Sequence, residues 1–434
     1  MKMIKIITCC LLMFSCPYVK AQKIQLDTYH FEEGLTFSDS KGNMMNLTGY
    51  VQPYFETRYL TGADGVDPLN RFRIRRLRFR VSGLSENQKL SYRLQFDLSG
   101  SSEVDESSAS YLMDAYVGYE LTSRIKAYFG QRATYTDNRE LFMASNTLQL
   151  VERSRLTSAF ASIREFGLFL QGNFRTGGGT YLKPYFTLTN GDGINVFNKD
   201  HGGLKIGGRL DFLPLGLFTN FGQFRQADIM RENTPKLVIG AVYSYNSGIS
   251  SRRGRESGSI LYLDDSGNES LPDYMKYGAD FLFKYRGFSM IGEFVKTKSN
   301  VPDDIRQRVR TDGSVSTSFL IDGIQNVENY IKNRMMLGEG YNIQAGYLFK
   351  SGISVDSRYT HLKADKYSFL NNGTFHNRPN YYTLGISKYA ARNYGSKIQL
   401  SVTYVDANEG INDNNGDPVS GNEWIGRLIL TVSF

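Results

Sequence analysis

The feature that most constrains this chain is an alternation of apolar and polar side chains that recurs from Leu47 onward. In residues 89–98, Leu, Tyr and Phe occupy every even position, while Lys, Ser, Arg, Gln and Asp occupy the odd positions. A two-residue period is that of a β-strand with two chemically different faces. The same division recurs in residues 278–285 and 397–404.

We count sixteen segments of this kind, and an even number is what a closed bacterial outer-membrane barrel needs. They lie at 46–59, 73–84, 88–100, 110–121, 124–134, 160–175, 180–190, 203–213, 235–247, 275–287, 288–298, 338–350, 352–364, 380–392, 395–406 and 422–434. The pattern therefore predicts an all-β fold. We expect a transmembrane antiparallel β-barrel of about sixteen strands over residues 46–434.

The lengths of the connections give a second, independent indication. Links after even-numbered strands are tight turns, such as Glu86-Asn87 and Ser351-Gly352. Links after odd-numbered strands are long, notably 135–159, 248–274, 299–337 and 407–421. Outer-membrane barrels alternate short periplasmic turns with long extracellular loops in this way. The link at 214–234 follows an even strand but is long, which indicates either a periplasmic excursion or a miscount of one hairpin.

A soluble β-sandwich is the main alternative, because its strands also bury one face and alternate in the same way. The chain has 29 Tyr and 28 Phe residues, many of them near strand ends on the apolar face. Aromatic girdles at the two bilayer interfaces explain that placement. No run of eighteen apolar residues follows the amino terminus, which excludes a helical membrane protein.

Residues 1–21 resemble a secretory signal peptide, with basic residues, an apolar stretch and expected cleavage after Ala21. The alternative is a lipoprotein acylated at Cys16, but a bulky Phe14 makes a poor lipobox. All three cysteines lie within this segment. The mature chain would have no thiol, which excludes a disulfide scaffold, a thiolate metal site and a cysteine nucleophile. Residues 22–45 are expected to form an N-terminal periplasmic segment.

The distribution of charge points to anions. Loss of Lys2, Lys5 and Lys20 lowers the formal charge from +8 to +5, which is too small for a nucleic-acid binder of this size. By strand parity, basic residues outnumber acidic residues on the face that would line the lumen. A basic lumen with a low-dielectric wall concentrates anions. The candidate pore-lining residues are Arg76, Arg78, Arg80, Arg93, Lys126, Arg132 and Arg209.

The densest basic feature lies within residues 71–80. Arg76, Arg78 and Arg80 would face inward about 6.5–7 Å apart, so that a phosphate-sized anion could pass from one guanidinium to the next. The alternative is that they neutralise carboxylates across the lumen, such as Asp97 and Asp114.

Two further arginines, Arg71 and Arg73, have the opposite parity. They are expected to face outward and meet lipopolysaccharide phosphates at the outer rim. The loop at 135–159 is a candidate constriction loop and carries Arg139, Arg153 and Arg155. Inside the pore the loop would narrow the lumen, whereas outside it would only place these charged residues on the surface of the protein.

A series of short motifs runs in the order found in one family. They include Phe72-Arg73-Ile74-Arg75-Arg76, Asp114-Ala115-Tyr116-Val117, Glu152-Arg153, Arg164-Glu165-Phe166-Gly167, Asn190-Gly191-Asp192-Gly193, Tyr277-Gly278-Ala279-Asp280 and Gly292-Glu293. On these residues the chain resembles the phosphate-selective porin O and P family. The resemblance implies a sixteen-stranded barrel in the outer membrane of a Gram-negative bacterium. It also implies a homotrimer among outer-membrane lipids that passes phosphate or other anions along inward arginines and lysines.

The same resemblance implies pore roles for Arg75, Arg76 and Arg132. Residues 132–135 read Arg-Ala-Thr-Tyr, which departs from the family's usual Lys-Thr-Pro-Phe and leaves the preferred anion open. The predicted function is passive diffusion of small anions, phosphate or polyphosphate, through an arginine- and lysine-lined pore. No cofactor, metal ion or nucleic acid is expected.

Three other functions compete with this prediction. A general or sugar-permeable porin with weak anion preference could use inward tyrosines as a slide; the candidates are Tyr50, Tyr54, Tyr116, Tyr128 and Tyr185. A structural protein with a plugged lumen is less favoured, because glycines at inward positions such as Gly118 and Gly346 indicate space inside. An enzyme is disfavoured, since only His361 of the four histidines lies within an expected strand, on its lipid-facing side.

Overall fold

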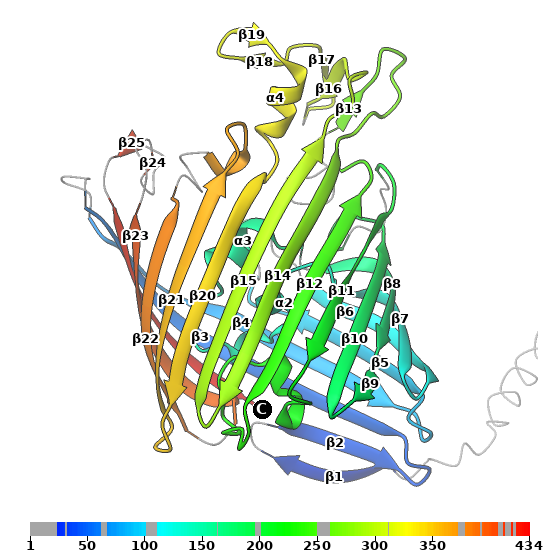
Figure 1. Cartoon of the computed structure of the whole chain (residues 1–434), viewed down its shortest axis with the longest axis vertical. Coiled ribbons are helices and arrows are strands. Elements are labelled where there is room, and N and C mark those ends of the chain that lie inside the picture. Colours follow the sequence, from blue (N-terminus) through cyan, green and yellow to red (C-terminus); the bar gives the residue numbers. More distant parts are fainter. Residues whose placement is uncertain are drawn as a thin grey trace, which may run out of the picture.

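A computed structural model describes residues 24–30, 33–61, 67–100, 111–162, 164–195, 201–249, 261–310, 312–371, 378–390, 393–406, 411–412, 418–419 and 422–434. The predicted signal peptide, with its three cysteines, lies outside these residues. The chain forms a closed antiparallel barrel of sixteen strands (Figure 1). Closure is made by the last strand pairing with the first, with Ile429 opposite Tyr54 and Val432 opposite Val51. The predicted fold class is confirmed.

All sixteen expected segments are strands of the barrel. In order around the wall they are β3 (Met44–Leu60), β4 (Leu69–Leu84), β5 (Leu90–Asp97), β6 (Leu112–Thr122), β7 (Ile125–Ala133), β8 (Arg164–Gly172) continued by β9 (Phe174–Gly177), β10 (Thr180–Thr189), β11 (Lys205–Leu213), β12 (Lys236–Asn246), β14 (Asp273–Tyr285), β15 (Phe288–Asn300), β20 (Gly338–Leu348), β21 (Ile353–Ala364), β22 (Asn380–Tyr389), β23 (Ser396–Asp406) and β26 (Glu423–Ser433).

The two faces of each strand are arranged inside out relative to a soluble β-sandwich. On β5, Leu94 is 41 % exposed, whereas Gln95 and Asp97 are only 3 % and 2 % exposed. The apolar face thus points outward and the polar face points into the barrel, as a lipid-facing wall requires. A sandwich would bury the apolar side chains instead. On the outer face, rings of Tyr341, Tyr359, Tyr382, Tyr404 and Trp424 form a row across five neighbouring strands.

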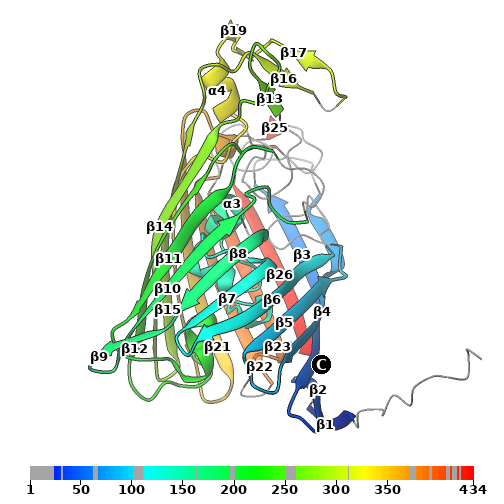
Figure 2. The same cartoon turned by 90° about the vertical axis from the view of Figure 1, so that its right-hand side faces the viewer.

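Two additions extend the barrel at its ends. At the end with short turns, β1 (Ile24–His30) and β2 (Gly34–Asp39) form a hairpin that pairs with the start of β3. At the end with long loops, a cap stands above β14 and β15 (Figure 2). It contains β13 (Leu261–Leu263), β16 (Gln307–Val309), β17 (Val315–Ser316), β18 (Leu320–Ile321), β19 (Ile324–Gln325) and α4 (Val327–Lys332).

A small apolar core holds this cap together, with Phe319 packed edge to face on Tyr330. The remaining short elements at the same end are η3 (Phe369–Asn371), β24 (Ile411–Asn412) and β25 (Pro418–Val419). Among the described residues, no helix is long and apolar enough to cross a membrane.

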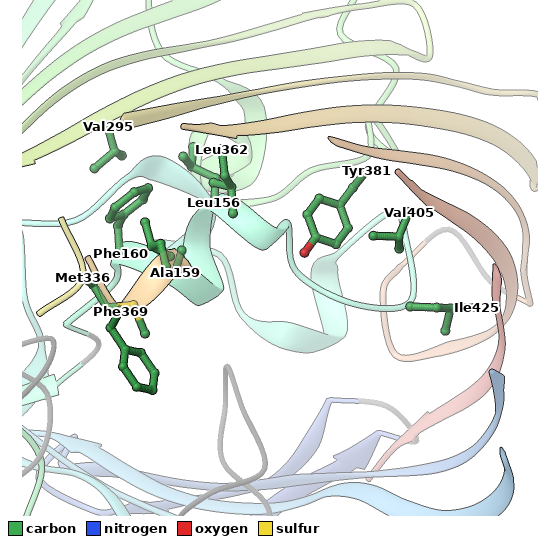
Figure 3. Close-up of a cluster of buried hydrophobic side chains, with 11 residues drawn as sticks. Leu156, Ala159, Phe160, Val295, Met336, Leu362, Phe369, Tyr381, Val405 and Ile425 are labelled. Atoms are coloured by element: carbon green, nitrogen blue, oxygen red, sulfur yellow. The ribbon is translucent and has the colours of Figure 1, made fainter. Parts of the chain in front are cut away.

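The loop that follows β7 folds into the barrel. It contains α2 (Arg139–Phe142), η1 (Ser145–Thr147) and α3 (Arg155–Phe160). Side chains of α3, among them Leu156 and Phe160, pack against inward residues of the opposite wall (Figure 3). Apolar packing of this kind inside a polar lumen fixes the loop against one part of the wall, from β15 round to β26.

The long link after β11 also turns into the lumen, from the end with short turns. It carries η2 (Thr219–Phe224), and inward Lys284 on β14 donates hydrogen bonds of 2.9 Å to the carbonyls of Gly222 and Ala227. The count of sixteen strands stands, so the link at 214–234 is an excursion of the chain and not a miscounted hairpin.

Candidate functional site

A β-bulge in β4 places adjacent arginines on the same side of the wall. Gln52 pairs with Arg76 and Pro53 pairs with Ile74, so Arg75 is an extra residue without a partner in the register. Pro53 has no amide hydrogen to donate to a ladder, and a bulge accommodates that missing bond. Arg75 and Arg76 are both buried inside the barrel as a result.

The bulge also reverses the parity of the strand before it. Phe72 is 84 % exposed on the outer face, so its neighbours Arg71 and Arg73 point inward. The Arg71 guanidinium lies 3.6 Å from the Glu56 carboxylate, and that of Arg73 lies 5.0 Å from the ring centre of Tyr54. The expectation that Arg71 and Arg73 face the outer rim is therefore wrong. One strand carries six inward arginines, at positions 71, 73, 75, 76, 78 and 80.

Arg75 and Arg76 both bind one carboxylate from the inward loop, that of Glu152. Arg75 Nε lies 2.5 Å from Glu152 Oε1, and Arg76 Nη2 lies 2.8 Å from Glu152 Oε2. Arg76 Nη1 also donates to Gln52 Oε1 at 3.0 Å. Burial by itself would raise the pKa of Glu152, but the charges of Arg75 and Arg76 outweigh it and hold the pKa well below its usual range.

Other predicted pore residues are paired along the wall. Arg78 binds Asp97 at 2.9 Å, which agrees with the alternative that it neutralises a carboxylate. Lys126 lies near the end with short turns and pairs with Glu120 at 3.0 Å.

Arg209 belongs to a buried network that anchors the loop. Arg139 on the loop binds both Asp211 and Asp280 at 2.8 Å, and Arg209 binds the same two carboxylates. Two cations and two anions balance here, and the network leaves no excess charge. Arg139 therefore anchors the loop to the wall through two ion pairs.

The other two loop arginines have different surroundings. Arg153 donates hydrogen bonds to the carbonyls of Glu140 and Met143, which closes the loop on itself. The Arg155 guanidinium lies 5.9 Å from the ring centre of Tyr381 on the wall.

A cluster of three arginines on β4, β5 and β7 differs from these pairs, and we call Arg80, Arg93 and Arg132 the basic wall cluster. Arg93 and Arg132 lie over the Tyr116 ring, at 5.8 and 4.8 Å from its centre. Arg80 donates through Nε to Gln95 Oε1 at 3.0 Å.

Carboxylates do not match the charge of this cluster. Within the described part of the chain, no carboxylate forms a hydrogen bond or ion pair with Arg80, Arg93 or Arg132. Asp114 lies within electrostatic range of all three, but its carboxylate is bound by Arg164 at 2.7 Å. Three guanidiniums therefore share a carboxylate that a fourth already holds.

Aromatic rings hold Arg132 in place. Its guanidinium lies 4.1 Å from the ring centre of Tyr128 and 5.0 Å from that of Tyr135, and Nη2 donates to the Tyr135 hydroxyl at 2.6 Å. Cation–π contacts fix the plane of the guanidinium without neutralising it. The N–H edge of the Arg132 guanidinium therefore keeps its positive charge.

The inward glycines do not mark empty space. A Cβ atom on Gly346 would lie 1.9 Å from Asp356 Oδ1 on β21 and 2.7 Å from Gln149 of the loop, and one on Gly118 would lie 2.6 Å from Ser91 Oγ and from the Tyr128 ring. Close approach of these side chains explains the two glycines, so the expectation that they indicate space inside is wrong. The loop reaches across the lumen: Glu152 contacts β4, Asp137 contacts β14, and Gln149 contacts β20 and β23.

One family model matches part of this chain. Residues 48–196 match the family described as phosphate-selective porin O and P. The predicted resemblance to this family is confirmed over these residues. The matched residues run from β3 to β10. They include the arginine-rich strand β4, the inward loop and the basic wall cluster. No match was found among curated proteins.

Solved porin and channel structures align over nearly the whole chain. The outer-membrane channel DcaP of Acinetobacter baumannii is 13% identical, with 92% of this chain and 99% of that chain covered and a TM-score of 0.49. OmpF of Salmonella typhi, in complex with daunomycin, is 12% identical, with 91% and 98% covered and a TM-score of 0.49. A mutant of the Rh. blastica porin is 13% identical, with 90% and 100% covered and a TM-score of 0.41.

Sequence reasoning missed two parts of the site. The bulge had a signal, because Pro53 interrupts one strand and Ile74-Arg75-Arg76 breaks the alternation in the next. The ion pairs of Glu152 with Arg75 and Arg76 had no signal in the sequence, since Glu152 lies 77 positions after Arg75 and 76 positions after Arg76.

Proposed function

We propose that this chain is an outer-membrane porin of a Gram-negative bacterium that gives passive diffusion to small anions such as phosphate or polyphosphate. The observation that carries the proposal is the basic wall cluster, whose three guanidiniums outnumber the nearby carboxylates. Fixed positive charge in a low-dielectric wall raises the local concentration of anions and guides them along the wall. No chemical step is involved.

The inward residues divide into three roles in this proposal. Arg80, Arg93 and Arg132 contact the passing anion directly, whereas Arg75 and Arg76 at the inward loop contact it only when it takes the place of the Glu152 carboxylate. Arg78, Lys126 and Arg209 contribute mainly to the field, because each is already bound to a carboxylate. Arg139, Arg153 and Arg155 hold the loop at 135–159, which narrows the path as a constriction.

A sugar slide has less support. Tyr50, Tyr54 and Tyr185 are almost completely covered by neighbouring side chains and offer no continuous stacking surface. Tyr116 and Tyr128 are occupied by the guanidinium of Arg132. We therefore propose an anion path in preference to a sugar path.

Reversal potentials in planar bilayers under a potassium chloride gradient test the proposal. The wild-type channel should prefer anions, and cation preference would refute an anion path. Changing Arg80, Arg93 and Arg132 together to Gln should bring the ratio of anion to cation permeability close to one. Arg306→Gln, an exposed arginine of the cap, is the matched control and should leave the ratio unchanged.

We also propose that three copies assemble as a homotrimer among outer-membrane lipids, as the family resemblance implies. Electrophoresis of unheated and boiled outer-membrane extracts checks this, since a folded trimer migrates as one slow band that boiling converts to monomer. A single monomer band after crosslinking in native membranes would contradict the trimer.

A further inference from the structure

We propose that Glu152 is a resident counter-ion: its carboxylate occupies the Arg75–Arg76 pair, and a permeating anion must displace it to bind there. The pair then favours anions of charge −2 over anions of charge −1. This inference rests on the proposed function, because it concerns how an anion passes the inward loop. It adds a selectivity step that the excess of basic residues does not by itself provide.

The contacts of Glu152 are those of a bound ligand. Its two carboxylate oxygens accept from two neighbouring guanidiniums, at 2.5 and 2.8 Å, with a third contact of 3.3 Å from Arg75 Nη2. The side chains of Arg75 and Arg76 are 5 % and 1 % exposed, whereas that of Glu152 is 14 % exposed. The Glu152 side chain is therefore the most accessible of the three, and an incoming anion would meet it first.

The backbone around Glu152 is held separately from its side chain. Arg358 on β21 donates through Nη1 to the Glu152 carbonyl at 2.8 Å, so the loop is attached to the wall at this residue. The carboxylate can leave the pair by side-chain rotation while the backbone stays in place. A tethered group of this kind competes with free ligands at a high effective concentration.

Charge decides which ligands win this competition. With Glu152 bound, the two guanidiniums share one carboxylate charge. A monoanion would replace a tethered carboxylate by an untethered group of the same charge and gain nothing from the exchange. A dianion brings two negative charges in place of one, and planar guanidinium forks bind several oxygens of one tetrahedral oxyanion. Hydrogen phosphate and sulfate belong to this class, and chloride and nitrate do not.

Replacing Glu152 by Gln tests the inference. The amide keeps the size of the side chain and one acceptor oxygen but removes its charge. Sulfate and nitrate are added as probes to a chloride current in planar bilayers. In the wild-type channel, sulfate should reduce the current at concentrations where nitrate has little effect. In Glu152→Gln, the sulfate concentration for half-block should fall about tenfold, as expected when a charged hydrogen-bonding competitor is removed. Nitrate should also begin to block.

Three further variants separate the possible outcomes. Arg76→Gln in the Glu152→Gln background should cancel the gain in sulfate block, because the pair no longer exists. Glu328→Gln, an exposed glutamate of α4 in the cap, is the matched control and should behave as wild type. Glu152→Asp keeps the charge but shortens the reach to the two guanidiniums. Glu152→Asp should give a gain in sulfate block between those of wild type and Glu152→Gln. It tests the inference by itself if Glu152→Gln does not assemble.

Half-block by sulfate within twofold of wild type in both Glu152 variants would overturn the inference. That result would leave the proposed function intact if the wild-type channel still prefers anions. Cation preference of the wild-type channel would instead refute the proposed function itself.

Discussion

Gln226, in the link after β11, donates through Nε2 to the Glu140 carboxylate in the inward loop at 3.1 Å. The two segments that enter the lumen from opposite ends of the barrel thus meet at this pair. Gln226 Oε1 also accepts from the backbone amide of Gln149 and from Gln344 on β20. One buried amide therefore ties the loop, the link and the wall together.

Gln226→Ala should loosen this junction. The change leaves Glu140 and the Gln149 amide short of a partner in a buried place, which costs roughly 1–3 kcal/mol per group. We expect larger and noisier single-channel conductance and a lower unfolding temperature. Gln307→Ala, on β16 in the cap, is the control; equal conductance in the two variants would contradict a junction at Gln226.

The reversed parity of β4 can be tested by cysteine accessibility, since the mature chain is expected to have no cysteine of its own. A negatively charged thiol reagent that does not cross membranes should react with Arg71→Cys and Arg73→Cys from the lumen and reduce the anion current. Phe72→Cys faces the outer side and should not respond. Reaction at position 72 with none at 73 would restore the regular parity and contradict the bulge.

Arg132→Lys tests whether the shape of the guanidinium matters in addition to its charge. Lysine keeps the charge but loses the planar contact with Tyr116 and Tyr128, worth about 0.5–2 kcal/mol. We expect a reduced preference for anions in reversal potentials, intermediate between wild type and Arg132→Gln. Arg306→Lys in the cap is the control. A permeability ratio equal to wild type in Arg132→Lys would reduce the role of Arg132 to charge alone.

The network that anchors the loop should be sensitive to loss of one acid. Asp280→Asn leaves Arg139 and Arg209 with a single carboxylate in a buried place, and breaking a buried pair in this way costs about 3–5 kcal/mol. Urea unfolding of the barrel in lipid vesicles measures the change. Asp265→Asn, whose side chain is exposed in the cap, should be close to neutral. Equal stability of the two variants would show that the network does not hold the loop.

The Glu152 contact should withstand mild acid. Its pKa in the folded state is depressed below the ordinary value of 4.5. A group with a depressed pKa contributes stability that is complete above the ordinary value and is lost as the pH falls through the folded value. Sulfate block of the wild-type channel should therefore be constant between about pH 8 and pH 5. A gain in block between pH 7 and pH 5 that occurs in the wild-type channel and is absent from Glu152→Gln would mean that Glu152 takes up a proton in that range.

The strands, their number and the sidedness of most of them follow from the sequence by itself. Alternation is a property of the local backbone, since successive side chains point to opposite faces whatever the rest of the fold does. Leu94, Gln95 and Asp97 therefore took their predicted sides. Short turns and long loops alternate along the chain as well, so the sequence also predicted closure into a barrel with an even number of strands.

Only the tertiary structure decided what the inward charges do. Arg76 and Glu152, Arg139 and Asp280, and Gln226 and Glu140 come together from distant positions, and no local period encodes such contacts. The bulge at Arg75 likewise depends on Pro53 in the neighbouring strand and moved Arg71 and Arg73 to the lumen. Strand parity predicts a basic lumen, but whether a given arginine is neutralised depends on which carboxylate the folded chain brings within reach of it.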